Sequence, residues 1–273
     1  MTAPPLVSRF RELHESGCFV LPNPWDLGSA KVLVQLGFKA VATTSCGLAW
    51  TLGVRDHAVT LEQKLAHLRV MTAAVPVPVN ADFEKGFAVA PVEVAANVTA
   101  AAATGIAGLS IEDSTGDPSN PLFDLSLAVE RMRAAREALD KSGTGVLLTG
   151  RSEGFLVGRP DLAETIRRLR AYADAGAECL YAPGLRDLPT IRAVVSAVKK
   201  PVNVVMSHMD PAITAAELAA AGVKRISVGG SLSRLALAAF LRGAREMKDT
   251  GGFTWARETV TGKELKGIFA RWQ

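Results

Sequence analysis

Eight short runs of apolar or β-branched residues recur along the chain, and an amphipathic stretch follows each of them. The runs are spaced by roughly 20 to 35 residues, as expected for alternating strands and helices. An uninterrupted series of such pairs favours a closed parallel barrel over an open sheet. The length of 273 residues also suits this fold, because a (β/α)8 barrel usually needs about 250 residues. We therefore predict an α/β protein with a (β/α)8, or TIM, barrel fold.

The sequence pattern places each element of this barrel. The predicted strands are Cys18–Pro22, Lys39–Thr44, Val77–Phe83, Gly108–Asp113, Gly145–Gly150, Glu178–Ala182, Val202–Met206 and Arg225–Val228. The predicted helices that follow them are Asp26–Leu36, Leu61–Ala74, Pro91–Thr104, Leu125–Lys141, Asp161–Ala175, Leu188–Val198, Ala212–Ala221 and Ser231–Lys248. An extra helix at about Leu6–Glu15 precedes the first strand. We expect a single domain over residues 1–273, with the barrel at about 17–250 and a C-terminal helical tail at 251–273.

The composition excludes several classes of protein. The 31 basic residues are interleaved with 27 acidic ones and form no basic block, so we expect no nucleic-acid partner. The net charge of +4 instead suits a small anionic substrate. No apolar run approaches the roughly 20 residues that a bilayer requires, and the first residues lack a signal-peptide core. With three cysteines, which argue against a disulfide scaffold, the sequence predicts a cytoplasmic protein without a membrane partner.

Acidic residues gather where the predicted strands end, which is where the active sites of such barrels lie. They are Asp56 after the second strand, Asp82 and Glu84 after the third, and Glu112 and Asp113 after the fourth. Neighbouring carboxylates repel one another unless a cation neutralises them, and oxygen ligands suit Mg²⁺, with Mn²⁺ also possible. Side-chain alternation along a strand puts Asp82 and Glu84 on one side. The alternative is that these two are solvated or paired with Lys85.

Two further features point to an anionic substrate. The planar guanidinium of Arg151, just past the fifth strand, matches a substrate carboxylate; alternatively it neutralises Glu153 or Glu112. After the second strand, successive backbone amides can face an anionic oxygen, with a glycine permitting close approach. The predicted substrate-binding residues are therefore Ser45, Cys46, Gly47, Leu48 and Arg151, the predicted metal-site residues are Asp56, Asp82, Glu84 and Glu112, and the predicted catalytic residues are Arg151, Glu112 and Asp56.

Five segments stand out together: LPNPWDLGSA (21–30), TTSCGLAWTLGVRD (43–56), NADFEKGF (80–87), GLSIEDST (108–115) and GRSEGFL (150–156). They resemble the phosphoenolpyruvate mutase/isocitrate lyase family, especially its short carboxyvinyl-carboxyphosphonate phosphorylmutase-like members. The resemblance implies a Mg²⁺-dependent barrel that acts on 2-oxo acids and related dicarboxylates. It implies that Asp82 binds the metal directly, that Asp56, Glu84 and Glu112 hold the metal's waters, and that Arg151 grips a substrate carboxylate. It also implies a homodimer or homotetramer, often with exchange of the last helix, which gives the tail a role.

The loop after the fourth strand departs from the family pattern. The carbon–carbon lyases carry Lys-Lys-Cys-Gly-His there, whereas this chain reads STGDPSNPLFD. The mutases carry a Lys and an Asn; here Asn120 is present without the Lys. What remains is enolate chemistry that needs little from a loop acid, such as decarboxylation or hydrolytic cleavage of an oxaloacetate-like substrate. If a different proton donor acts, the candidates are Cys46, Lys85 and His208.

Several functions remain open from the sequence. The leading hypothesis is a Mg²⁺-dependent lyase or decarboxylase of a small 2-oxo or 2-hydroxy dicarboxylic acid, acting through a metal-stabilised enolate. The second is a phosphonate enzyme, either a phosphonopyruvate hydrolase or a phosphoenolpyruvate-mutase-type enzyme. The third is a barrel that binds a small anion without catalysis. A fourth, a phosphate-binding barrel that uses Gly229, Gly230 and Ser231, leaves the acidic residues without a role.

Overall fold

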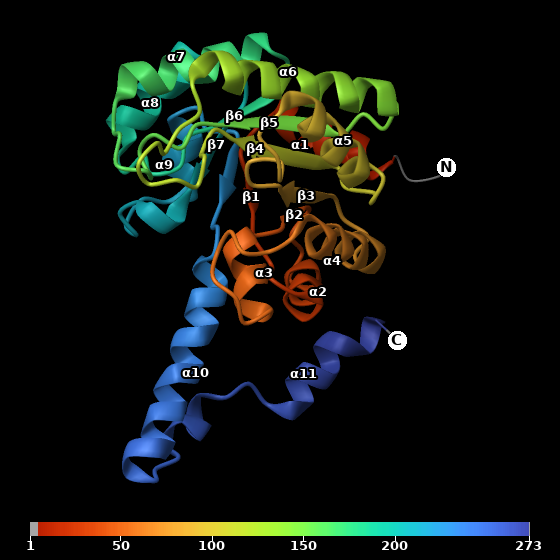
Figure 1. Cartoon of the computed structure of the whole chain (residues 1–273). Helices are drawn as coiled ribbons and strands as arrows, with labels where there is room; N and C mark the ends of the chain where they lie inside the picture. Colours follow the sequence, from red (N-terminus) through yellow and green to blue (C-terminus); the bar gives the residue numbers. More distant parts are fainter. Residues whose placement is uncertain (1–4, 273) are drawn as a thin grey trace.

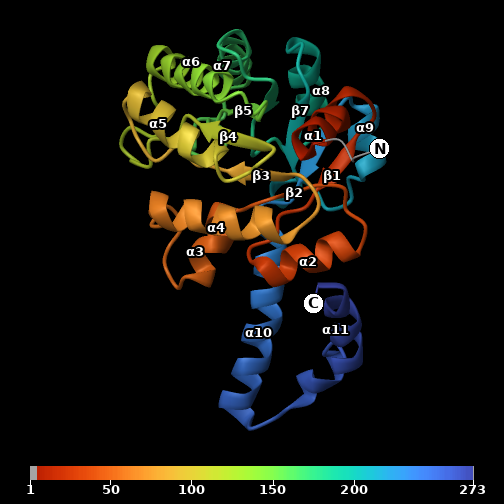
Figure 2. The ribbon, with the colours of Figure 1, turned by 90° about the vertical axis from the view of Figure 1, so that its right-hand side faces the viewer.

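Eight parallel strands form one sheet that curls into a barrel in the computed structural model, which describes residues 5–272 (Figures 1 and 2). Their order is β1-β8-β7-β6-β5-β4-β3-β2. The barrel closes where the Ala42 amide donates to the Pro22 carbonyl at 3.0 Å, between the ends of β2 and β1. The strands are β1 Phe19–Leu21, β2 Val41–Ala42, β3 Val79–Asp82, β4 Gly108–Glu112, β5 Leu147–Arg151, β6 Cys179–Tyr181, β7 Val202–Val205 and β8 Arg225–Ser227. The predicted (β/α)8 barrel is confirmed.

Helices surround the strands, and most of them begin where the sequence pattern predicts. They are α1 Leu6–Glu15, α2 Leu27–Gln35, α3 Ser45–Thr51, α4 Leu61–Ala74, α5 Pro91–Ala102, α6 Leu125–Ser142, α7 Leu162–Asp174, α8 Leu188–Ala197, α9 Ala215–Ala220, α10 Ser231–Thr250 and α11 Gly262–Phe269. Capping residues fix several starts: the side chains of Asp26, Thr60 and Thr214 accept from backbone amides in the first turn of α2, α4 and α9. The short helix α3 lies within a segment that the sequence pattern predicts as loop.

The apolar core lies between the strands and the surrounding helices. Leu109 and Leu148 are fully buried there together with Val94 and Leu169 from the helices. The amino-terminal end of the barrel is covered by α1, whose Phe10 is fully buried and belongs to the same cluster as Leu147 of β5. Helix α1 covers the amino-terminal end of the barrel, and the surrounding helices cover its sides. A site is therefore expected at the carboxyl-terminal end, where the loops that follow the strands can carry polar groups.

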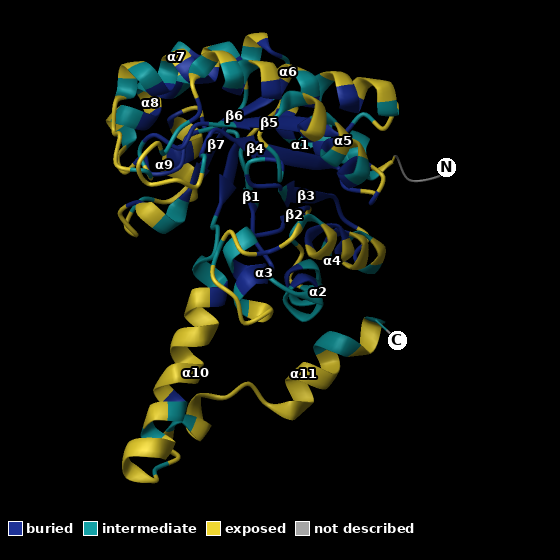
Figure 3. Ribbon diagram, viewed as in Figure 1, coloured by how far each residue is buried: buried dark blue, intermediate teal, exposed yellow. Residues whose placement is uncertain are grey.

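The C-terminal part leaves the barrel. Helix α10 extends away from it with most residues exposed (Figure 3), and α11 returns to lie beside α2. There the Arg271 guanidinium donates to the Gln35 side chain at 2.9 Å, and the Lys31 ammonium lies 5.3 Å from the centre of the Trp272 ring. The tail therefore contacts its own chain through α2. No helix within residues 5–272 is both long and apolar enough to cross a membrane.

Candidate active site

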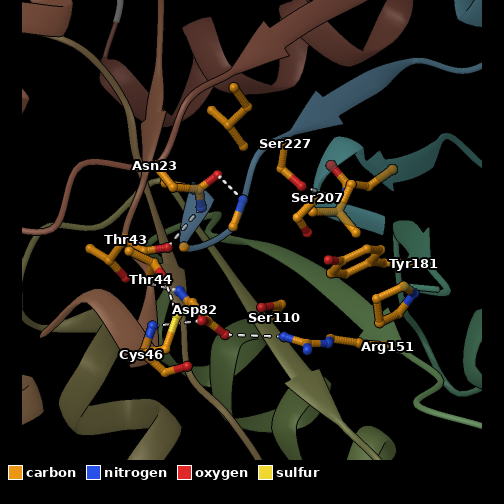
Figure 4. Close-up of a pocket in the computed structure, with 18 of the residues that line it drawn as sticks. Asn23, Thr43, Thr44, Cys46, Asp82, Ser110, Arg151, Tyr181, Ser207 and Ser227 are labelled. Carbon is orange, nitrogen blue, oxygen red and sulfur yellow. Dashed lines mark hydrogen bonds and ion pairs between the residues drawn. The ribbon is translucent and has the colours of Figure 1, made fainter. Parts of the chain in front are cut away.

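A cavity of about 190 Å³ opens at the carboxyl ends of the strands, where the barrel fold predicts a site. Figure 4 shows polar side chains from several strands converging on it. Its rim carries Ser45, Cys46, Asp56, Asp82, Arg151, Tyr181 and His208, and its deeper wall carries Asn80, Ser110, Asn203, Arg225 and Ser227. The cavity is thus lined by carboxylates near the rim and by an arginine and neutral polar groups deeper down.

Asp82 ends β3 and is held from three sides. One carboxylate oxygen, Oδ2, accepts the Ser45 amide at 2.8 Å, and Oδ1 lies 3.4 Å from Nη1 of Arg151. Its backbone amide donates to the Thr43 hydroxyl at 3.0 Å. Burial opposes ionisation, but Arg151 and the buried Lys64 outweigh it and hold the pKa of Asp82 below its usual value. Asp82 is therefore an ionised carboxylate at neutral pH.

Glu84 does not share the cavity of Asp82. Strand β3 ends at Asp82, and Glu84 has a left-handed backbone with φ of 47°, so strand alternation no longer applies to it. Its carboxylate instead faces a neighbouring cavity, also about 190 Å³, which is lined by Glu112 and His57 as well. The prediction that alternation puts Asp82 and Glu84 on one side is wrong, because the strand is too short.

Arg151 joins the two cavities. Its Nη1 lies 3.2 Å from Oε2 of Glu112 in addition to its contact with Asp82, and its Nε donates to Glu153. The guanidinium also lies 5.1 Å from the centre of the Tyr181 ring. Burial raises the pKa of Glu112 to about 8 although Arg151 opposes the shift. In this structure Arg151 thus neutralises carboxylates, which is the second of the two roles that the sequence leaves open for it.

His57 links the remaining acids. Its Nδ1 lies 3.2 Å from Oε2 of Glu84, and its Nε2 lies 3.9 Å from Oδ2 of Asp56. The Asp56 side chain is 41% exposed, and partial burial raises its pKa. The acids predicted from the strand ends are therefore neighbours on one rim, connected through the imidazole of His57 and the guanidinium of Arg151.

The residues at this rim fit a divalent cation. Five carboxylates (Asp56, Asp82, Glu84, Glu112 and Glu153) face three cationic side chains (His57, Lys64 and Arg151), which leaves two negative charges when all are ionised. The Oε1 atom of Glu84 is buried and has no hydrogen-bond partner, a costly state that a bound ion or its water would relieve. Within residues 5–272 no three His, Cys, Asp or Glu side chains are close enough to hold a metal together. A fitting ion is therefore one that keeps several waters, as Mg²⁺ does.

The backbone amides after β2 are mostly engaged. Thr44 caps α3, and the Leu48 amide donates to the Thr44 carbonyl at 3.1 Å, while the Gly47 amide points at the Thr44 hydroxyl at 3.5 Å. Gly47 and Leu48 are buried away from the cavity, whereas Ser45 and Cys46 line it. The expected cradle of four free amides is wrong for Gly47 and Leu48, because this segment is a helical turn, and for Ser45, because its amide donates to Asp82.

Two further polar groups, the Cys46 thiol on this turn and Asp113 directly after β4, also have identified partners. The Cys46 thiol lies 3.2 Å from the Thr44 hydroxyl, and burial raises its pKa. Asp113 follows Glu112 but points away from the rim. It accepts the Tyr172 hydroxyl at 2.5 Å and Arg168 at 3.1 Å, so its role is to hold α7 against the barrel.

Four lining or supporting residues escape the sequence analysis. Tyr181 ends β6, and Asn203 and Arg225 point inward from β7 and β8. A polar residue within a short apolar strand is a signal that could have found the last two. Lys64 lies on α4, is fully buried, and is 3.4 Å from the Thr43 hydroxyl. Nothing in the sequence around Lys64 separates it from an exposed helical lysine.

Comparison with known proteins agrees with this geometry. The model of the phosphoenolpyruvate phosphomutase family matches residues 10–248. A solved structure from Burkholderia cenocepacia J2315, provisionally described as a lyase/mutase, is 47% identical, with a TM-score of 0.94 over 97% of this chain and 96% of that one. The structure of 2,3-dimethylmalate lyase, a member of the PEP mutase/isocitrate lyase superfamily, is 26% identical, with a TM-score of 0.86 over 98% and 95%. Oxaloacetate decarboxylase of Chromohalobacter salexigens is 27% identical over 87% of this chain and 83% of that one.

The contact between His57 and Glu84 predicts an unusual titration. The hydrogen bond that the His57 ring donates to the Glu84 carboxylate raises the pKa of His57 from 6.5 to about 9. Because the folded-state pKa is the higher one, the pair stabilises the fold fully below about pH 6.5 and loses this contribution as the pH rises through about 9. In the metal-free protein we expect the His57 ring signals in NMR spectra to titrate near pH 9, and Glu84→Gln to move the midpoint toward 6.5.

His14 and His67 provide the internal control for this titration. Burial lowers their pKa values to about 3 and about 4, so their signals should stay constant over the same pH range in both proteins. A His57 midpoint near 6.5 in the native protein would contradict the assigned pair.

Proposed function

Since the chain belongs to the phosphoenolpyruvate phosphomutase family, we propose that it is a Mg²⁺-dependent lyase or decarboxylase of a small 2-oxo or 2-hydroxy dicarboxylic acid. The observation that carries the proposal is the excess of carboxylates around Asp82 at the mouth of the barrel. The names of its relatives support the reaction class, since they include a dimethylmalate lyase and an oxaloacetate decarboxylase. The cavity of about 190 Å³ admits a small organic acid.

In this proposal each rim residue has a defined task. Asp82 would hold the ion directly, while Asp56, Glu84 and Glu112 would hold its waters. When bound there, such an ion would supply Lewis-acid stabilisation of negative charge on the substrate oxygens. Asp82 is suited to its task because it is ionised at neutral pH, with its Oδ2 fixed by the Ser45 amide.

Arg151 is the proposed substrate-orienting residue. It uses Nη1 and Nε on carboxylates, and Nη2 has no hydrogen-bond partner within residues 5–272. Nη2 is therefore available to donate to a substrate carboxylate. Since Arg151 lies against the Tyr181 ring and is fixed by Glu153, it can orient an acid with little loss of side-chain entropy.

The reaction is tested with a panel of acids in MgCl₂, analysed for products: oxaloacetate, malate, 2,3-dimethylmalate, 2-methylisocitrate and phosphonopyruvate. We expect pyruvate or another 2-oxo acid from a phosphorus-free substrate, and no turnover after chelation of the metal. Release of phosphate from phosphonopyruvate alone would assign a phosphonate enzyme instead. A complete lack of turnover, with an acid still bound, would indicate a binding protein.

Asp82→Asn tests the metal assignment directly. We expect kcat/KM to fall by more than about 100-fold, the upper end of the effect for residues that contact a metal only through its ligands. The matched control is Asp249→Asn, whose carboxylate is exposed at the end of α10 and far along the chain from the rim; its activity should be unchanged. Normal turnover by Asp82→Asn would contradict the assignment.

We also propose that the chain forms a homodimer or homotetramer through α10. The support is a set of exposed apolar side chains on this protruding helix, Leu235, Leu237, Phe240 and Leu241, of which the last three lie on one face. Phe240 is 68% exposed, and clustered apolar exposure of this kind is typical of interaction surfaces.

Analytical ultracentrifugation measures the mass of the oligomer directly. We expect a mass of two or four times 28.8 kDa, and a shift toward the monomer in Phe240→Glu, because a charge would be buried at the interface. Lys248→Glu, at a side chain that is 85% exposed, is the control and should keep the native mass. A monomeric native protein would contradict the proposal.

A further inference from the structure

A buried arginine without a carboxylate partner lies deep in the barrel. Arg225 points inward from β8, is 2% exposed, and lines the cavity that holds Asp82 at its rim. Its Nε donates to Oδ1 of Asn203 at 2.8 Å, and its Nη2 donates to the Thr149 hydroxyl at 3.1 Å. Within residues 5–272 no carboxylate lies within 4.0 Å of it, whereas Arg151 and Arg168 form ion pairs. The buried Arg131 also lacks a carboxylate partner within this range, but three backbone carbonyls accept from it.

The third partner of Arg225 is a neutral histidine. Nδ1 of His14 lies 2.7 Å from the Phe10 carbonyl, so that nitrogen carries the proton. The other ring nitrogen, Nε2, is then free to accept from Nη1 of Arg225 at 3.2 Å. Burial, followed by the charge of Arg225, lowers the pKa of His14 to about 3, in agreement with a neutral ring. All contacts of Arg225 are therefore to neutral acceptors.

The buried guanidinium of Arg225 has an uncompensated positive charge and unused N–H donors. Buried charges are normally paired, because desolvation costs several kcal/mol per ion. The three contacts of Arg225 use three of its five N–H groups. A second group on the same wall, Oδ1 of Asn80, is buried without a hydrogen-bond partner; as an acceptor it suits a hydroxyl or a water beside the acid rather than a carboxylate. The hydroxyls of Ser110 and Ser227 also line this cavity, but they donate to the carbonyls of Ala81 and Val204 at 3.5 and 3.3 Å. The free donors of this floor are therefore the unused N–H groups of Arg225.

The distance between Arg225 at the floor and Arg151 at the rim matches the length of a short dicarboxylic acid. Thr149, which holds Arg225, and Arg151, which holds the rim carboxylates, both lie on β5 and are two residues apart. They consequently point to the same side of the strand and are separated by about 6.6 Å along it. A dicarboxylic acid of four or five carbons can therefore reach from the rim to the guanidinium of Arg225.

We propose that Arg225 and its neighbours form a carboxylate-binding floor that receives the distal carboxylate of the substrate. This inference rests on the proposed function, because the other end of the acid is taken to bind at the metal rim. It adds a selectivity that the rim does not provide: a diacid is favoured over a monoacid of the same length. Neutralising the guanidinium in place should remove this preference and leave the binding of a short acid at the rim unchanged.

The matched ligands are malate and 2-hydroxybutyrate, each in the same configuration. They share four carbons and the chelating end, and differ in a distal carboxylate against a methyl group. Isothermal titration in MgCl₂ gives both dissociation constants, and oxalate, too short to reach the floor, reports on the rim alone. In the native protein we expect malate to bind at least tenfold more tightly than 2-hydroxybutyrate, and oxalate to bind only with Mg²⁺.

Asn203→Asp is the main variant, because it keeps the shape and the acceptor for Arg225 and adds a compensating negative charge. We expect it to bind malate and 2-hydroxybutyrate equally, with oxalate affinity unchanged. Arg225→Met, which removes the charge, should do the same and serves if Asn203→Asp is not folded by circular dichroism. Thr149→Val removes one neutral contact but keeps the charge, so it should retain the malate preference.

These measurements test the metal-binding rim and the carboxylate-binding floor separately. Mg²⁺-dependent oxalate binding together with equal native affinities for the two longer acids would overturn the floor and leave the metal rim intact. A malate preference that survives in both Asn203→Asp and Arg225→Met would also overturn the floor. A malate preference without any Mg²⁺-dependent oxalate binding would overturn the rim and the proposed function, but not the floor.

Discussion

The mutual repulsion of carboxylates at the mouth of the barrel is the constraint on which the site depends. Asp82, Glu112 and Glu153 all contact one guanidinium, that of Arg151, and burial raises the pKa of both glutamates. Such crowding is costly unless further positive charge arrives. Lys64 supplies part of it from behind the strands, where burial lowers its own pKa. In the proposed function, a divalent cation would provide the remaining positive charge.

The fold makes this crowding possible without losing rigidity. Parallel strands bring their carboxyl ends to one rim, so residues distant in sequence meet there. Helix α1 plugs the other end, and its His14 also supports Arg225 from below. The barrel interior consequently has excess negative charge at the rim and the unpaired positive charge of Arg225 at the floor. This charge distribution is complementary to a small diacid that binds a metal ion at the rim with one end and Arg225 with the other.

The sequence predicts the barrel well because the alternation of strands and helices is long and regular. It also predicts that Asp56, Asp82, Glu84 and Glu112 lie at one rim, because carboxyl ends of parallel strands converge. The sequence-based prediction is wrong for residues whose side-chain direction depends on the local backbone conformation. Glu84 turns into a neighbouring cavity because β3 ends two residues earlier, and Gly47 and Leu48 are buried because Thr44 starts a helix. Lys64 contacts the site from a helix outside the strands, so only its three-dimensional contacts reveal it, whereas the position of Arg225 in a short apolar strand is a sequence signal that the analysis did not use.

The central claim, that the excess of carboxylates holds a divalent cation, is tested most directly by anomalous diffraction from crystals soaked in Mn²⁺, a substitute for Mg²⁺ with a usable signal. The account predicts one strong peak at the rim, within about 2.2 Å of an Asp82 oxygen, with Asp56, Glu84 and Glu112 reached through waters. Absence of a peak at millimolar Mn²⁺, or a peak away from Asp82, would contradict it.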